Sequence, residues 1–211
     1  MAELRRESPV KFTARPLETE ARDHWTVALA YDGEGDGPWL VDLSHKTRWD
    51  LQNRDIDAMT VGDLAVPEAA GDCTLAGHTL INRMNATQAA IHHLGARAPY
   101  MPDASGFTDV TEATLLVALF GPMAFRVAEK LTNLDFMDPA KEAPFLLQGP
   151  FGHVPCQIVA LEKTPDGSGG FLLSCSRGYG DSMVGAILQA GAEFGLRPAG
   201  ENRFDKWMER L

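Results

Sequence analysis

The chain has 211 residues, a formal net charge of -10 and 45% hydrophobic residues. These values are ordinary for a soluble globular protein with one sizeable core or two small lobes, and they exclude a chain that is disordered throughout. The acidic balance argues against a nucleic-acid partner, because binding to phosphates needs clustered Lys and Arg. No apolar run approaches the ~20 residues of a membrane span, so we expect a cytoplasmic protein without membrane contact.

The first half of the chain predicts an irregular arm over residues 1–22, followed by one domain over 23–211. Alternation of hydrophobic and polar residues predicts strands at 24–33, 39–44, 47–53 and 78–84. A short helix with an acidic first turn is predicted over 55–64. A second is predicted over 86–95, because Ala and Gln favour helices and Gly95 is a natural stop.

Residues 96–109 are rich in Pro and Gly and predict a boundary between two related lobes, at about 23–98 and 108–203. The second lobe has a clearer pattern. It predicts strands at 112–121, on both sides of Gly149–Pro155 and at 171–176, with helices at 122–134 and 182–195 and helical turns in 203–211. Antiparallel strands with helices on one face give an α+β fold.

Residues that often carry chemistry give no clear site. Cys73, Cys156 and Cys175 form no CxxC pair, so we expect buried reduced thiols and no metal site. His92 and His93 would point about 100° apart on a helix, which predicts a surface pair and not two ligands of one metal.

Two further patterns could indicate either a functional site or ordinary packing. Asp42 and His45 lie on one stretch, but nothing in the sequence supplies a nucleophile that faces both, so we do not predict a catalytic dyad. The four tryptophans are scattered along the chain and predict core or interface packing, not a platform for bases.

Four segments in order resemble the folate-binding region of the glycine cleavage T-proteins (aminomethyltransferases). They are LVDLSHKTRWDLQNRDIDAM, INRMNATQAAIHHL, LLVALFGPMAFRVAEKL and GGFLLSCSRGYGDSMVGAILQAGAEFGLRPAG, spread over about residues 38–203. The resemblance implies two related lobes of antiparallel sheet. It also implies a pocket to which the pair Asn82 and Asn85 contributes.

The chain departs from that family at the residues that carry the chemistry. An Asp seven residues after the first Asn of the pair assists carbon transfer in the family, and counting from Asn82 reaches Ala89. Ser168 stands near the position of the Glu that holds the pterin, and Arg203 in GENR remains from a Gly-x-x-Arg element. A methyl group cannot accept a proton or hold a cationic amine.

With about 200 residues and without the catalytic residues of that family, this chain resembles the gamma subunit of heterotetrameric sarcosine oxidase and the small subunit of N-methylglutamate dehydrogenase. The resemblance implies an accessory role without catalytic residues or a cofactor in this chain. FAD, FMN, NAD and tetrahydrofolate are then expected in larger partner subunits. Residues 1–22 and 203–211 are expected at the interface. The alternatives are a stand-alone folate-binding one-carbon transferase that uses Asn82, Asn85 and Arg203, or an unrelated α+β regulatory module.

Overall fold

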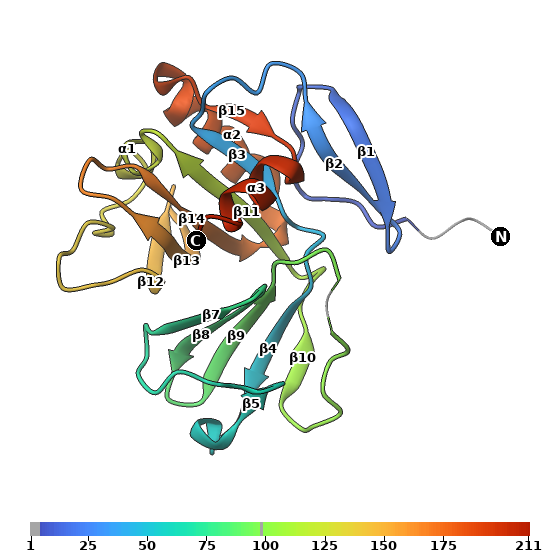
Figure 1. The fold of residues 1–211 in the computed structure, drawn as a ribbon, viewed down its shortest axis with the longest axis vertical. Coiled ribbons are helices and arrows are strands. Elements are labelled where there is room, and N and C mark those ends of the chain that lie inside the picture. Colours follow the sequence, from blue (N-terminus) through green and yellow to red (C-terminus); the bar gives the residue numbers. More distant parts are fainter. Residues whose placement is uncertain (1–4, 98) are drawn as a thin grey trace.

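The chain forms two lobes, each built on one mainly antiparallel sheet (Figure 1). The computed structural model describes residues 5–97 and 99–211. The lower lobe in Figure 1 holds a five-stranded sheet of order β10-β4-β9-β8-β7, and the upper lobe a six-stranded sheet of order β12-β13-β14-β11-β3-β15. The predicted α+β class is therefore confirmed.

The lower sheet is formed by strands within residues 48–109, whereas the strands of the upper sheet come from before and after that segment. The strands of the lower lobe are β4 (Arg48–Gln52), β7 (Cys73–Ala76), β8 (Thr79–Asn85), β9 (Gln88–His93) and β10 (Phe107–Asp109). Those of the upper lobe are β3 (Trp39–Asp42), β11 (Thr114–Gly121), β12 (Phe145–Phe151), β13 (Val154–Lys163), β14 (Gly169–Ser176) and β15 (Arg197–Ala199). Two hairpins complete the strands, β1 (Pro16–Arg22) with β2 (Trp25–Tyr31), and β5 (Thr60–Val61) with β6 (Leu64–Ala65).

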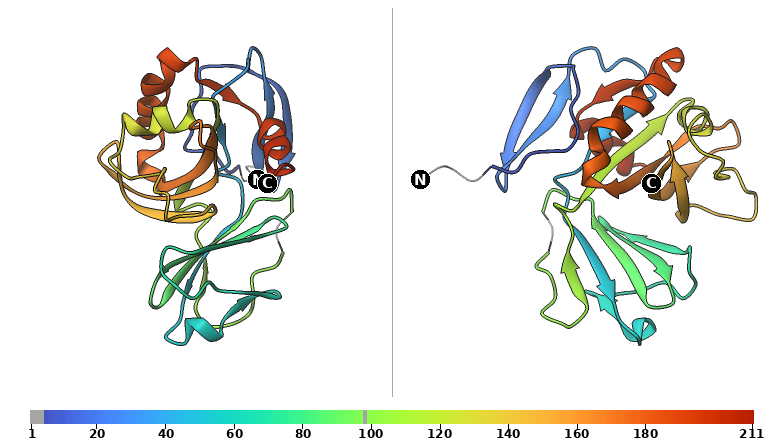
Figure 2. Two further views of the ribbon diagram at one scale, coloured as in Figure 1. Left: turned by 60° about the vertical axis from the view of Figure 1, so that its left-hand side comes forward. Right: turned by 180° about the vertical axis from the view of Figure 1, so that it is seen from behind.

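Helices cover the upper lobe on both faces of its sheet (Figure 2). They are α1 (Ala124–Glu129), α2 (Gly180–Gly191) and α3 (Glu201–Met208). The described residues also form single 3-10 turns, η1 (Ile56–Ala58) in the lower lobe and η2 (Arg177–Tyr179) and η3 (Ala192–Phe194) in the upper lobe. None of the described helices is long and apolar enough to span a membrane.

Strand β11 explains why helices cover both faces of the upper sheet. Its residues are buried on both faces, so its sequence is a continuous apolar run and not an alternation. Val117 and Leu119 face α1 and α2, whereas Leu116, Ala118 and Phe120 face α3 and the lower lobe. The placement of α3 on this second face is a feature that the predicted one-sided arrangement did not include.

The helix predicted over 86–95 is wrong, because this segment is strand β9. Ala86 and Thr87 form a tight turn, in which the Asn85 side chain accepts a hydrogen bond from the Thr87 backbone N–H at 3.0 Å. Strand β9 then pairs with β8 on one side and β4 on the other and is buried on both faces. Burial in the middle of a sheet outweighs the weak helix preference of Ala and Gln.

Other predicted elements are shorter or replaced. The helix predicted over 55–64 is only the single turn η1, followed by the small β5–β6 hairpin. The helix predicted over 122–134 is limited to α1. Residues 16–22, predicted to be irregular, form strand β1.

The first described residues pack against the body of the same chain. Arg6 forms ion pairs with Asp23 and Glu112, the latter at 2.9 Å. Val10 and Phe12 pack against the hydrophobic cluster beneath α1 and α2. These contacts make the segment part of the fold of this chain. Its role at a subunit interface stays a prediction.

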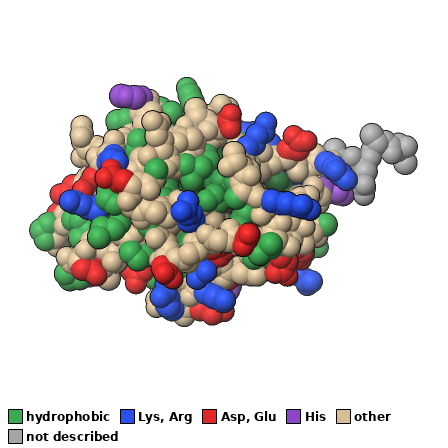
Figure 3. Space-filling view, turned by 90° about the horizontal axis from the view of Figure 1, so that it is seen from above, with side chains coloured by type: hydrophobic (Ala, Val, Ile, Leu, Met, Phe, Trp, Pro, Cys, Tyr) green, Lys and Arg blue, Asp and Glu red, His purple; other side chains and the backbone are tan. Residues whose placement is uncertain are grey.

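The surface mixes charges of both signs. Seen from above, Lys and Arg side chains alternate with Asp and Glu, and hydrophobic side chains lie between them (Figure 3). On this face the net negative charge is thus not concentrated in one patch.

Candidate functional site

The five positions taken from the resemblance do not meet in one pocket. Asn82 and Ala89 lie on neighbouring strands β8 and β9 but face opposite sides of the five-stranded sheet. Ala89 is fully buried beside Leu51 in the cluster with Trp49. None of the five cavities described for this chain is lined by Ala89. Its position therefore gives no independent support to the inference that a catalytic acid was lost there.

Asn82 has an unusual environment. Its side chain is completely buried next to Ala90, and neither its amide nitrogen nor its oxygen has a hydrogen-bond partner among the described residues. A buried amide without partners costs about 1–3 kcal/mol, so Asn82 lowers the stability of the fold. Asn85, in contrast, is exposed and hydrogen-bonds the Gln88 side chain at 3.1 Å.

Ser168 and Arg203 lie in the upper lobe, both beside Trp39. Ser168 lines a cavity of about 320 Å³ together with Trp39. Arg203 on α3 stacks its guanidinium over the Trp39 ring at 4.8 Å, and its Nε donates to Glu34 at 3.2 Å. Each of these two side chains has neighbours within the fold that account for its placement.

Arg22, His45 and Lys46 surround the buried carboxylate of Glu201 in one cluster of charges. Glu201 begins α3 and is 1% exposed. Its carboxylate accepts two hydrogen bonds of 2.9 Å from Arg22 on β1, contacts His45 Nε2 at 3.2 Å and forms an ion pair with Lys46. The cluster thus joins the first hairpin, the β3–β4 turn and the last helix.

Electrostatics fixes the protonation state of this carboxylate. Burial alone would raise the pKa of Glu201, but the hydrogen bond from His45 and the cations Lys46 and Arg22 outweigh burial and hold the pKa well below its usual range. Glu201 is therefore ionised at all ordinary pH values. A carboxylate in this state is a poor general acid or base near neutral pH, and its surroundings fit a structural ion cluster.

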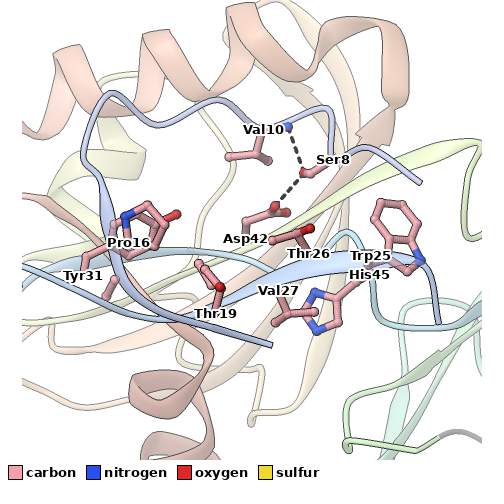
Figure 4. Close-up of a pocket in the computed structure, with 12 residues that line it drawn as sticks. Ser8, Val10, Pro16, Thr19, Trp25, Thr26, Val27, Tyr31, Asp42 and His45 are labelled. Carbon is pink, nitrogen blue, oxygen red and sulfur yellow. Dashed lines mark hydrogen bonds between the residues drawn. The ribbon is translucent and has the colours of Figure 1, made fainter. Parts of the chain in front are cut away.

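A small cavity of about 150 Å³ lies next to this cluster, beneath the N-terminal segment (Figure 4). Ser8 reaches in from that segment and donates to Asp42 at 2.5 Å, while Asp42 also accepts from the Ser44 backbone N–H at 2.9 Å. Burial, with smaller contributions from Asp42 and Glu34, raises the pKa of Tyr31 in the same wall to about 12.

Asp42 and His45 have different hydrogen-bond partners in the structure. Asp42 is engaged by Ser8 and Ser44, whereas His45 pairs with Glu201. The partner of His45 thus lies 156 residues away in sequence. An acidic residue after Gly200 at the start of a helix was the only sequence signal for Glu201, and no spacing rule connects it to His45 or Arg22.

A second cavity, of about 370 Å³, lies on the other side of His45. Arg22, Lys46 and His93 are among its lining residues. Arg22 and Lys46 are already paired with Glu201, whereas Arg97, which also lines this cavity, is exposed and adds positive charge there.

The prediction that His92 and His93 form a surface pair is wrong, since each is only 3% exposed. Burial, together with the nearby charges of Arg48 and His93, lowers the pKa of His92 to about 3, and burial lowers the pKa of His93 to about 4. His92 Nδ1 and His93 Nε2 have no hydrogen-bond partner among the described residues. Both rings are therefore neutral in the folded chain near neutral pH.

We expect the free energy of unfolding to fall when the pH is lowered below about 6.5. In the unfolded chain both histidines bind protons near pH 6.5, whereas in the folded chain they resist protonation down to about 3 and 4. The loss should approach ~1.4 kcal/mol per pH unit for each histidine at most. Urea unfolding at several pH values tests this, and His92→Gln should flatten the dependence between pH 6.5 and 4.5. An identical slope in that variant would contradict it.

Most of the cysteines and tryptophans are buried, whereas Cys73 and Trp39 are only partly buried. Cys156 and Cys175 are buried free thiols, and Cys73 is a half-buried free thiol. Trp25, Trp49 and Trp207 are buried.

Comparisons with known proteins agree with this architecture. The sequence matches no protein-family model. Over 92 residues it is 36% identical to an aminomethyltransferase of Geobacillus thermodenitrificans (strain NG80-2), a match that covers 44% of this chain and 24% of that protein. The match thus spans about a quarter of the length of the curated relative.

The fold is similar to that of a chain in the heterotetrameric sarcosine oxidase from Corynebacterium sp. U-96, which was solved in complex with pyrrole 2-carboxylate. The TM-score is 0.57 at 13% sequence identity, and the match covers 74% of this chain and 84% of the other. Sequence identity this low establishes likeness of fold alone. The two comparisons confirm the predicted resemblance: the chain is similar to an aminomethyltransferase in part of its sequence and to a chain of heterotetrameric sarcosine oxidase in its fold.

Proposed function

We propose that this chain is a non-catalytic, gamma-type accessory subunit of a heteromeric flavin-dependent oxidoreductase that acts on N-methyl amino acids. The complex would be of the sarcosine oxidase or N-methylglutamate dehydrogenase type, and it would release a one-carbon unit as formaldehyde or to tetrahydrofolate. The observation that carries the proposal is the fold match to a chain of comparable length from a heterotetrameric sarcosine oxidase.

The state of the titratable side chains supports an accessory role. The buried carboxylate of Glu201 is neutralised by basic neighbours, and His92 and His93 are enclosed in the sheet as neutral rings. Each of these three groups is almost fully buried, whereas a general acid or base must reach a substrate. The chemistry then belongs to other subunits of the complex.

The proposal assigns the cofactors to the partners. FAD, FMN, NAD and tetrahydrofolate would be bound by larger subunits, and this chain would contact those subunits in the cytoplasm. Its part in the complex would be to complete the assembly.

A second candidate is a stand-alone folate-binding one-carbon transferase. The sequence identity to an aminomethyltransferase favours it, as does the unpartnered amide of Asn82, which is the kind of group that a bound ligand could satisfy. Asn85 and Arg203 would be further contacts in this candidate, although they lie on different lobes.

Titration of the isolated full chain with tetrahydrofolate separates the two candidates. The accessory role predicts no saturable heat by calorimetry and no oxidation of sarcosine or N-methylglutamate by the chain alone. Saturable binding in the micromolar range that is lost in Asn82→Ala would favour the transferase instead. Asn133→Ala, at a position outside all five predicted pocket residues, is the matched control.

A further inference from the structure

Two of the three cysteines lie directly opposite each other on neighbouring strands. Strands β13 and β14 pair antiparallel, with Gln157 opposite Ser174 and Ile158 opposite Leu173. The same register continued by one residue sets Cys156 opposite Cys175. Both side chains belong to the one hydrophobic cluster beneath α1 and α2, so they lie on the same face of the sheet.

This arrangement meets the geometric requirement of a disulfide. Opposite residues in an antiparallel pair have Cα atoms about 4.5–5.5 Å apart, within the range of about 4.4–6.8 Å that disulfides span. Each thiol shifts the pKa of the other, so the two sulfur groups are near neighbours. In the structure both are free, and each also lies near a backbone carbonyl, Cys156 Sγ at 3.3 Å from Val154 O and Cys175 Sγ at 3.6 Å from Ser176 O.

The three thiols differ in reactivity. The hydrogen bond from Cys156 lowers the pKa of Cys175, and the same contact, with burial, raises the pKa of Cys156. Burial raises the pKa of Cys73 to about 12. Because the thiolate is the nucleophile, Cys175 is the thiol of the three that is prepared to react first. It lies near the end of β14, next to the exposed Ser176.

We propose that Cys156 and Cys175 form a site of reversible oxidation, which hydrogen peroxide or another small hydroperoxide converts into a cross-strand disulfide. The inference rests on the strand register and burial of the pair, and it is independent of the proposed function.

The reaction balances with peroxide as the only oxidant. The Cys175 thiolate attacks one peroxide oxygen, the O–O bond breaks, and the departing hydroxide takes up a proton to give water. The Cys156 sulfur then attacks the Cys175 sulfur, the S–S bond forms and the S–O bond breaks. The second hydroxide leaves with the Cys156 proton as water. The two thiols lose two protons and two electrons in total. A thiol reductant reverses the change.

Tryptic peptides make the test direct, because each cysteine falls in a different one. Cys73 lies in 55–83, Cys156 in 142–163 and Cys175 in 164–177. The full folded chain is treated with hydrogen peroxide, alkylated in denaturant and digested without reductant. We expect 142–163 joined to 164–177, and denatured-state thiols reduced from three to one, with dithiothreitol restoring all three.

Variants of each cysteine complete the experiment. Cys73→Ala should keep the linked peptides, while Cys156→Ala and Cys175→Ala should each abolish them. Mapping of the unmodified chain decides the question even where a variant folds poorly. Full alkylation of both 142–163 and 164–177 after peroxide treatment would overturn the proposal, as would a linkage through 55–83 or oxidation of single cysteines beyond sulfenic acid.

Discussion

Glu201→Gln is expected to lower the free energy of unfolding by about 3–5 kcal/mol, the usual cost of removing one partner from a buried ion pair. The substitution keeps the size of the side chain but removes its charge. Lys46, which is 2% exposed, would then remain buried without a counter-charge, and Arg22 would keep at most one of its two 2.9 Å bonds, because the new amide NH2 cannot accept. Because the cluster joins β1, the β3–β4 turn and α3, the loss should be cooperative over the upper lobe.

The matched control is Glu209→Gln at the exposed end of the same helical segment, where a change within about 0.5 kcal/mol is expected. Urea denaturation at neutral pH measures both. The pH dependence has a defined sign, since the pKa of Glu201 is lowered on folding. Its stabilisation is present above the ordinary value of 4.5 and declines as the pH falls below that value. Equal stability of the two variants would refute the structural role of the cluster.

Arg48→Met is expected to cost about 3–5 kcal/mol, since buried carbonyls would lose charged donors. The Arg48 guanidinium donates to the backbone oxygens of Lys46 at 2.7 Å and of Thr114 at 2.9 Å, and also to that of Thr111. These groups lie in the two connections that run between the lobes, before β4 and before β11. Burial lowers the pKa of Arg48 to about 10, so the side chain stays charged at neutral pH.

Arg54→Met is the control, because Arg54 is exposed near the end of β4 and the substitution removes the same charge from the same lobe. Its unfolding free energy should match that of the unmodified chain to within about 0.5 kcal/mol. Hydrogen exchange offers a second readout, with faster exchange of the Val110 and Ala113 amides expected in Arg48→Met. Unchanged exchange and stability in that variant would show that Arg48 does not hold the connections together.

The sequence predicted those parts of the fold whose local pattern agrees with their tertiary setting. The continuous apolar run of β11 and the Gly-bounded strand β14 were predicted correctly because burial on both faces leaves a clear apolar signature. Strand β9 was missed because Ala and Gln favour helices locally, and its strand state depends on β4 and β8 on its two sides. The fold class came from the order of such segments, and the resemblance to known families did not depend on any single one.

The candidate site was less predictable than the fold, for a physical reason. Glu201 meets Arg22 across 179 residues of sequence, and such a contact leaves no spacing pattern. Asn82 and Ala89 were linked by a seven-residue spacing taken from the aminomethyltransferase family, but in the β8–β9 hairpin this spacing sets them on opposite faces of one sheet. The sequence shows which residue types are present, but only the strand register determines which of them are in contact.

Purification of this chain with an affinity tag from its native cells tests the accessory role most directly. The account predicts a stable complex with larger subunits that carries a flavin absorption spectrum and oxidises sarcosine or N-methylglutamate. It also predicts that the chain purified alone has neither the spectrum nor the activity. A chain that elutes as a monomer without flavin and binds tetrahydrofolate saturably would contradict the account.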